Sequence, residues 1–493
     1  MELTTCVVAF VVFLVIYLWL HRSDPRLPPT PVRALPVVGH LFSLAQDTRQ
    51  QFKQWRKQSG DIFSLYLGQS LVVVLNGYDL IKEALVKQAE FFSDRPPFFI
   101  DTVTGDSGKG VIFSSGALWK EQRSVSLSIL RSFGMGKNVL AEKIQEEVDC
   151  YVKCLAGLKE KPTDIRLMTN ISTSNIICSI LIGRRFEYDD KQFQDLIHKL
   201  GNLSTEQRSG SVVNFFPWLR HLPGDIFKAK TLAMSTTAIL KMLSGVLNEK
   251  KRQVVVDSND VCNFIDAYII ERNKRTQAGV STTLDDLNLL KITNDLFSAG
   301  TETTSTTIYW CILYMLNYPE VQKKVYEEIK DKVGTDRTPT IQDKTDLTYL
   351  RAVIMETQRL ASIVPLSLTH MVSEKVTLRG YTLPKGTWIL PNLDSVLHDK
   401  TTWGEDAMSF RPERFIDNDG KLKNPEQFIP FSIGRRACLG ESLAKMELFL
   451  FLSNMFQRFQ FLPADPRSIP SLAYRPAIVM TPHDYQVRVV ERM

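Results

Sequence analysis

The chain has 493 residues, of which 44% are apolar and 23% are charged, a composition typical of a globular protein with enough length for a large core. Its 60 basic and 54 acidic residues leave a formal net charge of only +6, which excludes a concentrated nucleic-acid-binding surface. Its seven cysteines are odd in number and include no C-x-x-C pair, so they argue against a disulfide framework and indicate a reducing compartment.

The amino-terminal segment differs from the rest of the chain. Residues 3–20, LTTCVVAFVVFLVIYLWL, carry no charge, and at a helical rise of about 1.5 Å per residue this run spans the hydrocarbon core of a bilayer. A cleaved signal peptide is the alternative, but the apolar run is long for a signal core and no small-x-small cleavage site follows it. We therefore expect residues 1–21 to form a single uncleaved transmembrane helix.

The charges beside this segment predict its orientation. Arg22, Arg26 and Arg33 follow it, whereas Glu2 is the one charged side chain before it. Because positive charge is retained on the cytosolic side, we expect the bulk of the chain to face the cytosol. The membrane that we expect it to be anchored in is that of the endoplasmic reticulum, which the charges themselves do not specify. Residues 22–39 contain five prolines and predict a stiff linker to the folded body at residues 40–493.

Two stretches of the body predict short strands. Residues 61–77, DIFSLYLGQSLVVVLNG, contain a turn signal between two strand-like runs and indicate a β-hairpin. Residues 375–391 predict a second strand pair, divided at Arg379-Gly380 and again at Pro384. Most of the remainder has helical spacing, as in residues 116–130, 138–158, 169–183, 260–275 and 285–316. Since strands and helices do not alternate regularly, we predict a mainly α fold with small β-sheets.

The stretch FIPFSIGRRACLGES, residues 428–442, places Cys438 in a glycine-built loop before a long apolar helical pattern. Nearby arginine, accessible backbone N–H groups and the amino end of the helix all favour a thiolate. No histidine or second cysteine lies within twenty residues, which disfavours a zinc cluster. From these features alone, a metal ligand, a nucleophile and an inert buried cysteine all stay open.

The same stretch resembles the haem-binding signature of the cytochrome P-450 superfamily at every fixed position, Phe431-x-x-Gly434-x-Arg436-x-Cys438-x-Gly440. The resemblance implies the cytochrome P-450 fold and makes Cys438 the proximal thiolate ligand of the iron in haem b. It implies that Gly434 and Gly440 let the backbone approach the ring and donate to the sulfur. Phe431 is then expected to pack beside the thiolate, and Arg436 to pair with a haem propionate.

The centre of the helix predicted at 285–316 supports this resemblance. Its sequence SAGTETTSTT, residues 298–307, is rich in poor helix formers although its flanks are apolar. It resembles the family's oxygen-activation motif, Ala299-Gly300-x-Glu302-Thr303-Thr304, which implies that Ala299 lies at the haem and that Gly300 permits a local opening of the helix. Thr303 is then expected to hydrogen-bond the oxygen substrate, and Glu302 to feed protons toward it.

Other segments agree with the family pattern. Glu356-x-x-Arg359, with Arg414 in FRPERF, is expected to form a Glu–Arg–Arg network that braces the cysteine loop. Four further residues are expected haem contacts by resemblance to the microsomal group. They are Trp119 and Arg123 in a W-x-x-x-R pattern on one helical face, Arg95 in FFSDRP, and His370 in SLTHMV.

The resemblance covers nearly the whole chain and is closest to microsomal drug-, fatty-acid- and steroid-oxidising members. It implies that residues 40–493 are the haem-containing catalytic domain of a membrane-anchored monooxygenase, which inserts one atom of O2 into an apolar small molecule. Because the chain has no nucleotide-binding glycine loop, electrons are expected from NADPH–cytochrome reductase, with cytochrome b5 as a further partner.

Two sets of residues follow from this expectation. Apolar substrate contacts are expected from Phe98, Phe99, residues 202–216, Phe297, Ala299, residues 363–368 and Tyr474. A basic surface for the reductase is expected from Lys120, Arg131, Lys137, Arg435 and Lys445.

Three alternatives stay open at this point. An isomerase or dehydratase is compatible with the same scaffold, but such enzymes tend to lack the acid–threonine pair found at Glu302-Thr303. A cysteine-nucleophile hydrolase requires a base near Cys438, and none is apparent in the sequence. A non-catalytic haem carrier or sensor does not need the threonine-rich helix centre.

Overall fold

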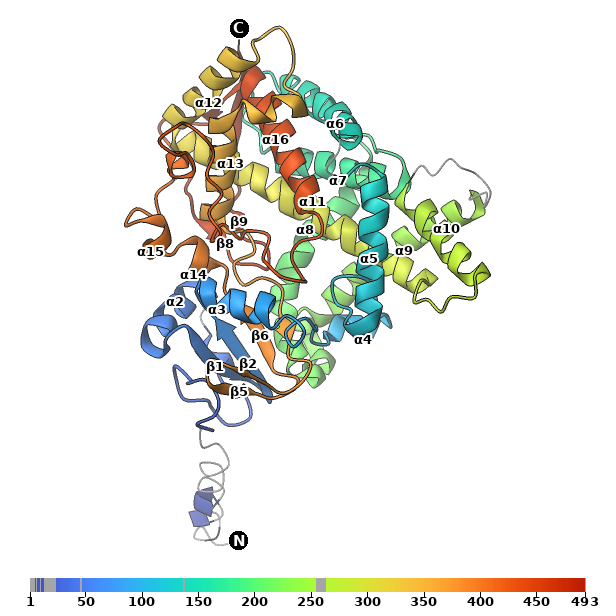
Figure 1. Ribbon diagram of the computed structural model, residues 1–493, viewed down its shortest axis with the longest axis vertical. Coiled ribbons are helices and arrows are strands. Elements are labelled where there is room, and N and C mark those ends of the chain that lie inside the picture. Colours follow the sequence, from blue (N-terminus) through green and yellow to red (C-terminus); the bar gives the residue numbers. More distant parts are fainter. Residues whose placement is uncertain are drawn as a thin grey trace. The chain divides into compact units, whose positions relative to one another are not determined.

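The computed structural model describes residues 5, 7, 8, 10–12, 24–44, 47–135, 138–253 and 263–492, whose helices and strands are shown in Figure 1. The predicted transmembrane helix at 1–21 lies largely outside these residues. Within the described part of the chain, no helix combines the length and apolar character needed to cross a membrane. The chain forms two compact units, Met1–Pro96 with Leu366–Ser395 and Pro97–Pro365 with Val396–Met493.

The first unit is built on a four-stranded sheet. Strands β1 (Ile62–Leu67) and β2 (Ser70–Leu75) form the predicted antiparallel hairpin. Strand β6 (Trp388–Pro391) runs parallel to β2, and β3 (His370–Met371) pairs antiparallel with β6. The strand order is therefore β1-β2-β6-β3, which joins two segments of the chain about 300 residues apart in sequence.

The second predicted strand pair is also present in this unit. Strands β4 (Val376–Leu378) and β5 (Tyr381–Leu383) meet at Arg379 and Gly380, whose φ angles of 50° and 83° fit a tight hairpin turn. The remaining elements of the unit are α2 (Thr48–Ser59), α3 (Tyr78–Lys82) and the short turns η1 (Leu41–Ser43) and η2 (Glu83–Lys87).

The second unit is mainly helical, as predicted. Its principal helices are α4 (Phe99–Thr104), α5 (Gly116–Ser132), α6 (Asn138–Ala156), α7 (Arg166–Ile182), α8 (Lys191–Gly210), α9 (Ala229–Gln253), α10 (Phe264–Gln277), α11 (Asp286–Asn317), α12 (Pro319–Lys332), α13 (Thr348–Ala361) and α16 (Glu441–Arg458). Short pieces are η3 (Ser211–Asn214), η4 (Pro217–His221), η5 (Pro223–Asp225), η6 (Ile341–Thr345), α15 (Lys400–Trp403) and η7 (Pro412–Phe415), and α14 (Asp394–Leu397) is a single turn. Two small sheets pair β7 (Phe459–Pro463) with β10 (Val487–Glu491), and β8 (Tyr474–Arg475) with β9 (Thr481–Pro482).

Helix α11 is the centre of this unit's core, and it is drawn in yellow in Figure 1. Asp285 caps its amino end by accepting the backbone N–H of Asn288, and the helix ends before Pro319, which cannot continue it. It packs along α7 and also contacts α13 and α16. Because α11 is buried along most of its length, any accessible residue near its middle requires a specific explanation.

Candidate active site

The cysteine loop is held by its own backbone. The Cys438 N–H donates to the Phe431 carbonyl at 3.0 Å, and the Ala437 N–H donates to the Gly434 carbonyl at 3.1 Å. Gly434 has a φ of 80°, a conformation that side chains other than glycine rarely adopt. This glycine is therefore required by the turn that presents Cys438 directly before α16.

Cys438 is an exposed residue, although protein atoms lie closely around its thiol. Desolvation by these surroundings and the charge of Glu441 raise the pKa of the thiol, while the backbone N–H groups of Gly440 and Glu441 and the charge of Arg123 act to lower it. A Cβ added at Gly440 meets no protein atom, and its φ of −90° suits any residue. Neither packing within the chain nor backbone conformation therefore requires glycine at 440. The space beside Gly440 is open and can hold a group from outside the chain.

One aromatic and two basic side chains cluster beside the cysteine loop, with Trp119 and Arg123 coming from α5 and Arg436 from the loop itself. The Arg436 guanidinium lies 3.9 Å from the centre of the Trp119 ring and donates to the Ser114 carbonyl at 2.5 Å. Arg123 donates to the Ala437 carbonyl at 2.6 Å, so it supports the cysteine loop directly. Trp119 Nε1 is buried and has no hydrogen-bond partner among the described residues. A buried donor beside two cations fits an acidic acceptor such as a carboxylate.

The middle of α11 includes an accessible stripe. Ala299 is exposed, and Glu302 and Thr303, three and four residues later on the same helical face, are partly accessible. The Thr303 hydroxyl donates to the Ala299 carbonyl at 2.8 Å, which holds it within its own helix. An accessible stripe in the middle of a mostly buried helix is suited to contact a ligand rather than another part of the core.

The other faces of the same turn are explained by packing. A Cβ on Gly300 would lie 2.5 Å from Cδ1 of Ile177, so this glycine lets α7 approach α11 closely. On the same side, Ser174 Oγ donates to Thr301 Oγ1 at 3.1 Å. Thr304 faces α16, where its hydroxyl donates to Glu447 at 2.8 Å. The predicted opening of the helix at Gly300 stays a prediction, and the close helix contact is an additional reason for glycine there.

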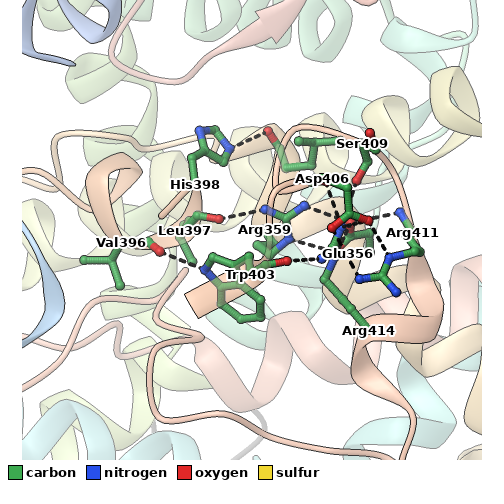
Figure 2. A network of polar contacts seen from close by, with 11 residues as sticks. Glu356, Arg359, Val396, Leu397, His398, Trp403, Asp406, Ser409, Arg411 and Arg414 are labelled. Atoms are coloured by element: carbon green, nitrogen blue, oxygen red, sulfur yellow. Dashed lines mark hydrogen bonds and ion pairs between the residues drawn. The ribbon is translucent and has the colours of Figure 1, made fainter. Parts of the chain in front are cut away.

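The predicted Glu–Arg–Arg network is present and fully buried (Figure 2). Arg359 donates to both Glu356 oxygens at 2.7 and 2.8 Å, and Arg414 donates to Glu356 Oε1 at 2.9 Å. The two arginines also donate to the carbonyls of Leu397 and Trp403 at 2.8 and 2.6 Å. The network thus fastens α13 and η7 to each other and to the last residues of α14 and α15.

Aromatic packing connects this network to the cysteine loop. Phe415, next to Arg414 in η7, lies 5.1 Å from Phe428 between ring centres. Phe428 stands three residues before Phe431, where the loop begins. The network therefore packs against the segment that leads into the loop, and its carboxylate is too deeply buried to reach a substrate. Its predicted role in bracing the loop stays a prediction.

Arg95 and His370 belong to the first unit. Arg95 donates to the carbonyls of Leu368 and Thr369, both at 2.7 Å, and His370 Nδ1 is 2.7 Å from the Phe92 carbonyl oxygen. Both side chains are buried. These contacts fix the two residues within their own unit, and their predicted role as haem contacts stays a prediction.

Comparison with known proteins decides the family. Residues 28–489 match the family described as Cytochrome P450. The chain is 41% identical to Cytochrome P450 2U1 of Rattus norvegicus over 97% of this chain and 93% of that protein. It is 39% identical to Cytochrome P450 2J2 of Homo sapiens over 99% of this chain and 96% of that protein, and 39% identical to Cytochrome P450 2C3 of Oryctolagus cuniculus over 94% of each. The chain belongs to the cytochrome P450 family.

As a P450, the enzyme is a haem monooxygenase that binds haem b through a cysteine thiolate. The residues around Cys438 fit such a group, because Cys438 is exposed, its sulfur receives backbone N–H groups and it lies near Arg123. In the part of the chain that the structure describes, no group of three or more histidine, cysteine or acidic side chains is placed to hold a metal ion by itself. Family membership also removes the hydrolase from the alternatives.

The residues predicted to contact substrate are placed differently from one another. Phe297 is 2% exposed and belongs to the main core of the P450, so its side chain is a packing residue. Phe99 is buried in a small cluster with Val213 and Leu232, whereas Phe98 packs edge-on against Phe113 at 5.1 Å between ring centres.

The residues of the predicted basic surface for the reductase are mostly accessible. Lys120, Arg131 and Arg435 are exposed and Lys445 is half-buried, whereas Lys137 lies outside the described residues.

A buried cluster of charged side chains at the amino-terminal half of α11 was not predicted from the sequence. Lys291 on α11 contacts Asp101 and Asp106 at 2.9 and 2.8 Å, and all three side chains are at most 5% exposed. Asp295, one turn later, accepts the N–H groups of Val111 and Ile112 at 2.8 and 3.0 Å, and burial raises its pKa to about 6. The sequence signal that could have predicted this cluster is the i, i+4 spacing of Lys291 and Asp295 in a mostly apolar helix. The cluster anchors the segment after α4 to α11.

Proposed function

We propose that Cys438 is the thiolate ligand of haem b in this P450 and that the accessible stripe of α11 forms the oxygen-binding side of the site. The accessible Ala299 and Thr303 in the middle of a buried helix carry this proposal. When bound, haem supplies the iron at which dioxygen is cleaved. Trp119, Arg123 and Arg436 would hold its acidic groups, since they combine an unpartnered buried donor with two cations.

In this proposal Thr303 and Glu302 deliver protons to the oxygen substrate. The Thr303 hydroxyl, now donating to Ala299, turns to donate to the oxygen substrate. Glu302 supplies the proton, and its pKa suits that task. Although its side chain keeps some solvent access, desolvation raises its pKa to about 7, against a smaller lowering by the charge of Arg166. At neutral pH the carboxyl is therefore shared between its acidic and basic forms.

Turnover is expected to decline as pH rises through about 7, because the protonated form of Glu302 is the proton donor. Glu302→Gln should lower turnover by about 10² and flatten this part of the pH profile. Arg166→Gln should move the decline to higher pH, because removing the positive charge lets the pKa rise further. Initial rates over a pH series, with reductase in excess, test this.

Arg475→Gln is the matched control for that series. Arg475 and Arg166 both contact Asp484, at 2.6 and 3.2 Å, but only Arg166 acts on Glu302. The pH profile of Arg475→Gln should coincide with that of the unmodified enzyme. A Glu302→Gln enzyme that keeps the original decline would assign the titration to another group.

We further propose that electrons come from NADPH–cytochrome reductase, with cytochrome b5 as a second donor, at the cytosolic face of the endoplasmic reticulum membrane. The apolar run at 3–20 and the arginines after it support the location. The exposed basic residues Lys120, Arg131 and Arg435 support docking of an acidic partner. The net reaction takes R–H, O2, two electrons and two protons to R–OH and water.

The substrate class we propose is an apolar small molecule, a lipid, steroid or xenobiotic. Apolar residues such as Phe98, Ile363 and Tyr474 are only partly buried in the second unit, and the apolar surface that they leave accessible supports this proposal. The test is incubation of the reductase-supplemented enzyme with heavy-isotope dioxygen and a panel of fatty acids, steroids and drugs. One heavy oxygen atom per product molecule is expected, and a product without it would favour an isomerase or dehydratase.

A further inference from the structure

Glu447 is a buried acid for which the monooxygenase reaction has no evident use. It lies on α16, nine residues after Cys438, and only 1% of it is exposed. Its neighbours Met446, Leu448 and Phe449 are buried and apolar. Oε2 accepts the Thr304 hydroxyl at 2.8 Å, whereas Oε1 has no hydrogen-bond partner among the described residues. No salt bridge involving Glu447 is found in the part of the chain that the structure describes.

An isolated carboxylate at such a place is costly, so the group is expected to be a neutral acid. Burial raises the pKa of Glu447 to about 8, and the Thr304 hydroxyl acts to lower it. No charged side chain of the described residues on α6, α11, α13 or α16 contributes to this shift. At neutral pH the side chain therefore carries one O–H and can both donate and accept a hydrogen bond.

The position of Thr304 on α11 shows that Glu447 links α16 to α11. Thr304 follows Thr303 directly, but it is 3% exposed and faces α16 rather than the accessible stripe. Glu447 consequently touches neither substrate nor the reacting oxygen. Helix α16 begins at Glu441, immediately behind the cysteine loop, so the Thr304–Glu447 bond joins the helix behind Cys438 to the turn of α11 that carries Thr303.

We propose that Glu447, as a neutral carboxylic acid, is a positioning residue that fixes the oxygen-side turn of α11 relative to α16, the helix that follows Cys438, through the Thr304 hydroxyl. The inference rests on the proposed function, since it gives the bond a catalytic consequence. With the bond in place, Thr303 stays aligned with the oxygen substrate and reducing equivalents reach product. Without it, the same turn still folds but proton delivery is misaligned, and reduced oxygen is lost as peroxide.

Three variants separate this role from simple core packing. Glu447→Gln keeps a neutral group that accepts from Thr304, Glu447→Leu fills the space without a hydrogen bond, and Thr304→Val removes the donor. Glu447→Leu and Thr304→Val should each lower product formed per NADPH consumed by about three- to tenfold, as loss of one buried hydrogen bond predicts. Glu447→Gln should remain within about twofold of the unmodified enzyme. Glu142→Gln, an exposed glutamate on α6, is the matched control.

The protonation state of Glu447 is tested separately, by thermal unfolding as a function of pH. The thermal unfolding midpoint of the unmodified enzyme should fall relative to that of Glu447→Gln as pH rises from about 4.5 to about 8, and the difference should be constant above that range. The sign follows because the unfolded glutamate ionises near 4.5 while the folded one keeps its proton until about 8. A difference that does not change with pH would contradict a neutral Glu447.

The outcomes distinguish this inference from the proposed function. If Glu447→Leu retains the coupling of NADPH consumption to product, the carboxyl is only core filling and the inference is overturned. If Glu447→Gln is as poorly coupled as Glu447→Leu, a neutral acceptor is insufficient and the inference is again overturned. If the unmodified enzyme itself shows no spectrum of thiolate-ligated haem, the proposed function is contradicted, whatever the Glu447 variants do.

Discussion

Glu356→Ala is expected to prevent accumulation of folded haem protein. The substitution leaves the Arg359 and Arg414 guanidinium groups buried without their common carboxylate, and breaking a buried ion pair in this way costs about 3–5 kcal/mol. That is comparable with the whole stability of a typical domain, about 5–15 kcal/mol. Haem content per milligram of purified protein and the yield of soluble enzyme measure the effect.

Glu327→Ala is the matched control for this prediction. Glu327 also lies one helical turn from a basic partner, Lys323, but at 3.7 Å and with both side chains more than half exposed. An exposed pair of this kind contributes about 0.3–0.5 kcal/mol, so yield and haem content should not change. Equal losses in Glu327→Ala and Glu356→Ala would contradict the assignment of Glu356 to a supporting network.

Cys438→Ser is expected to abolish substrate oxidation. Serine is nearly isosteric, so the turn made by Gly434 and the Cys438–Phe431 backbone bond are retained. A hydroxyl is a far poorer ligand for iron than a thiolate, and it cannot donate the electron density that the reaction needs. Turnover with NADPH and reductase should fall below detection, and the enzyme should lose haem or bind it with an altered spectrum.

Cys150→Ser is the control for the cysteine substitution. Cys150 is a half-buried free thiol on α6, and nothing in its surroundings resembles the loop at Cys438. Its replacement should leave haem content and turnover unchanged. If Cys438→Ser retains turnover, another residue must hold the iron, and the proposed roles of Trp119, Arg123 and Arg436 lose their basis.

Much of this P450 was predictable because its strongest signals are local in sequence. The turn at Gly434 and the helix that follows Cys438 belong to one continuous stretch, and the same holds for Ala299, Glu302 and Thr303. The hairpin of β1 and β2 was likewise predictable, since its two strands are separated by a two-residue turn. In each case the residues that determine the structure are neighbours along the chain.

The features that escaped prediction depend on partners far apart in sequence. The contacts of Lys291 with Asp101 and Asp106 join residues 190 and 185 positions apart, and the Thr304–Glu447 bond joins residues 143 apart. A sequence pattern shows an acid within an apolar run but not the hydroxyl that it meets. Gly300 shows the same limit, because its close neighbour Ile177 comes from a different helix.

The absorption spectrum of the reduced, carbon-monoxide-bound enzyme tests the central claim most directly. Thiolate ligation by Cys438 predicts a main band far to the red of that of a histidine-ligated haem, and the band should be lost or shifted in Cys438→Ser. A histidine-type band in the unmodified enzyme, or an identical red-shifted band in Cys438→Ser, would contradict the assignment of the iron ligand.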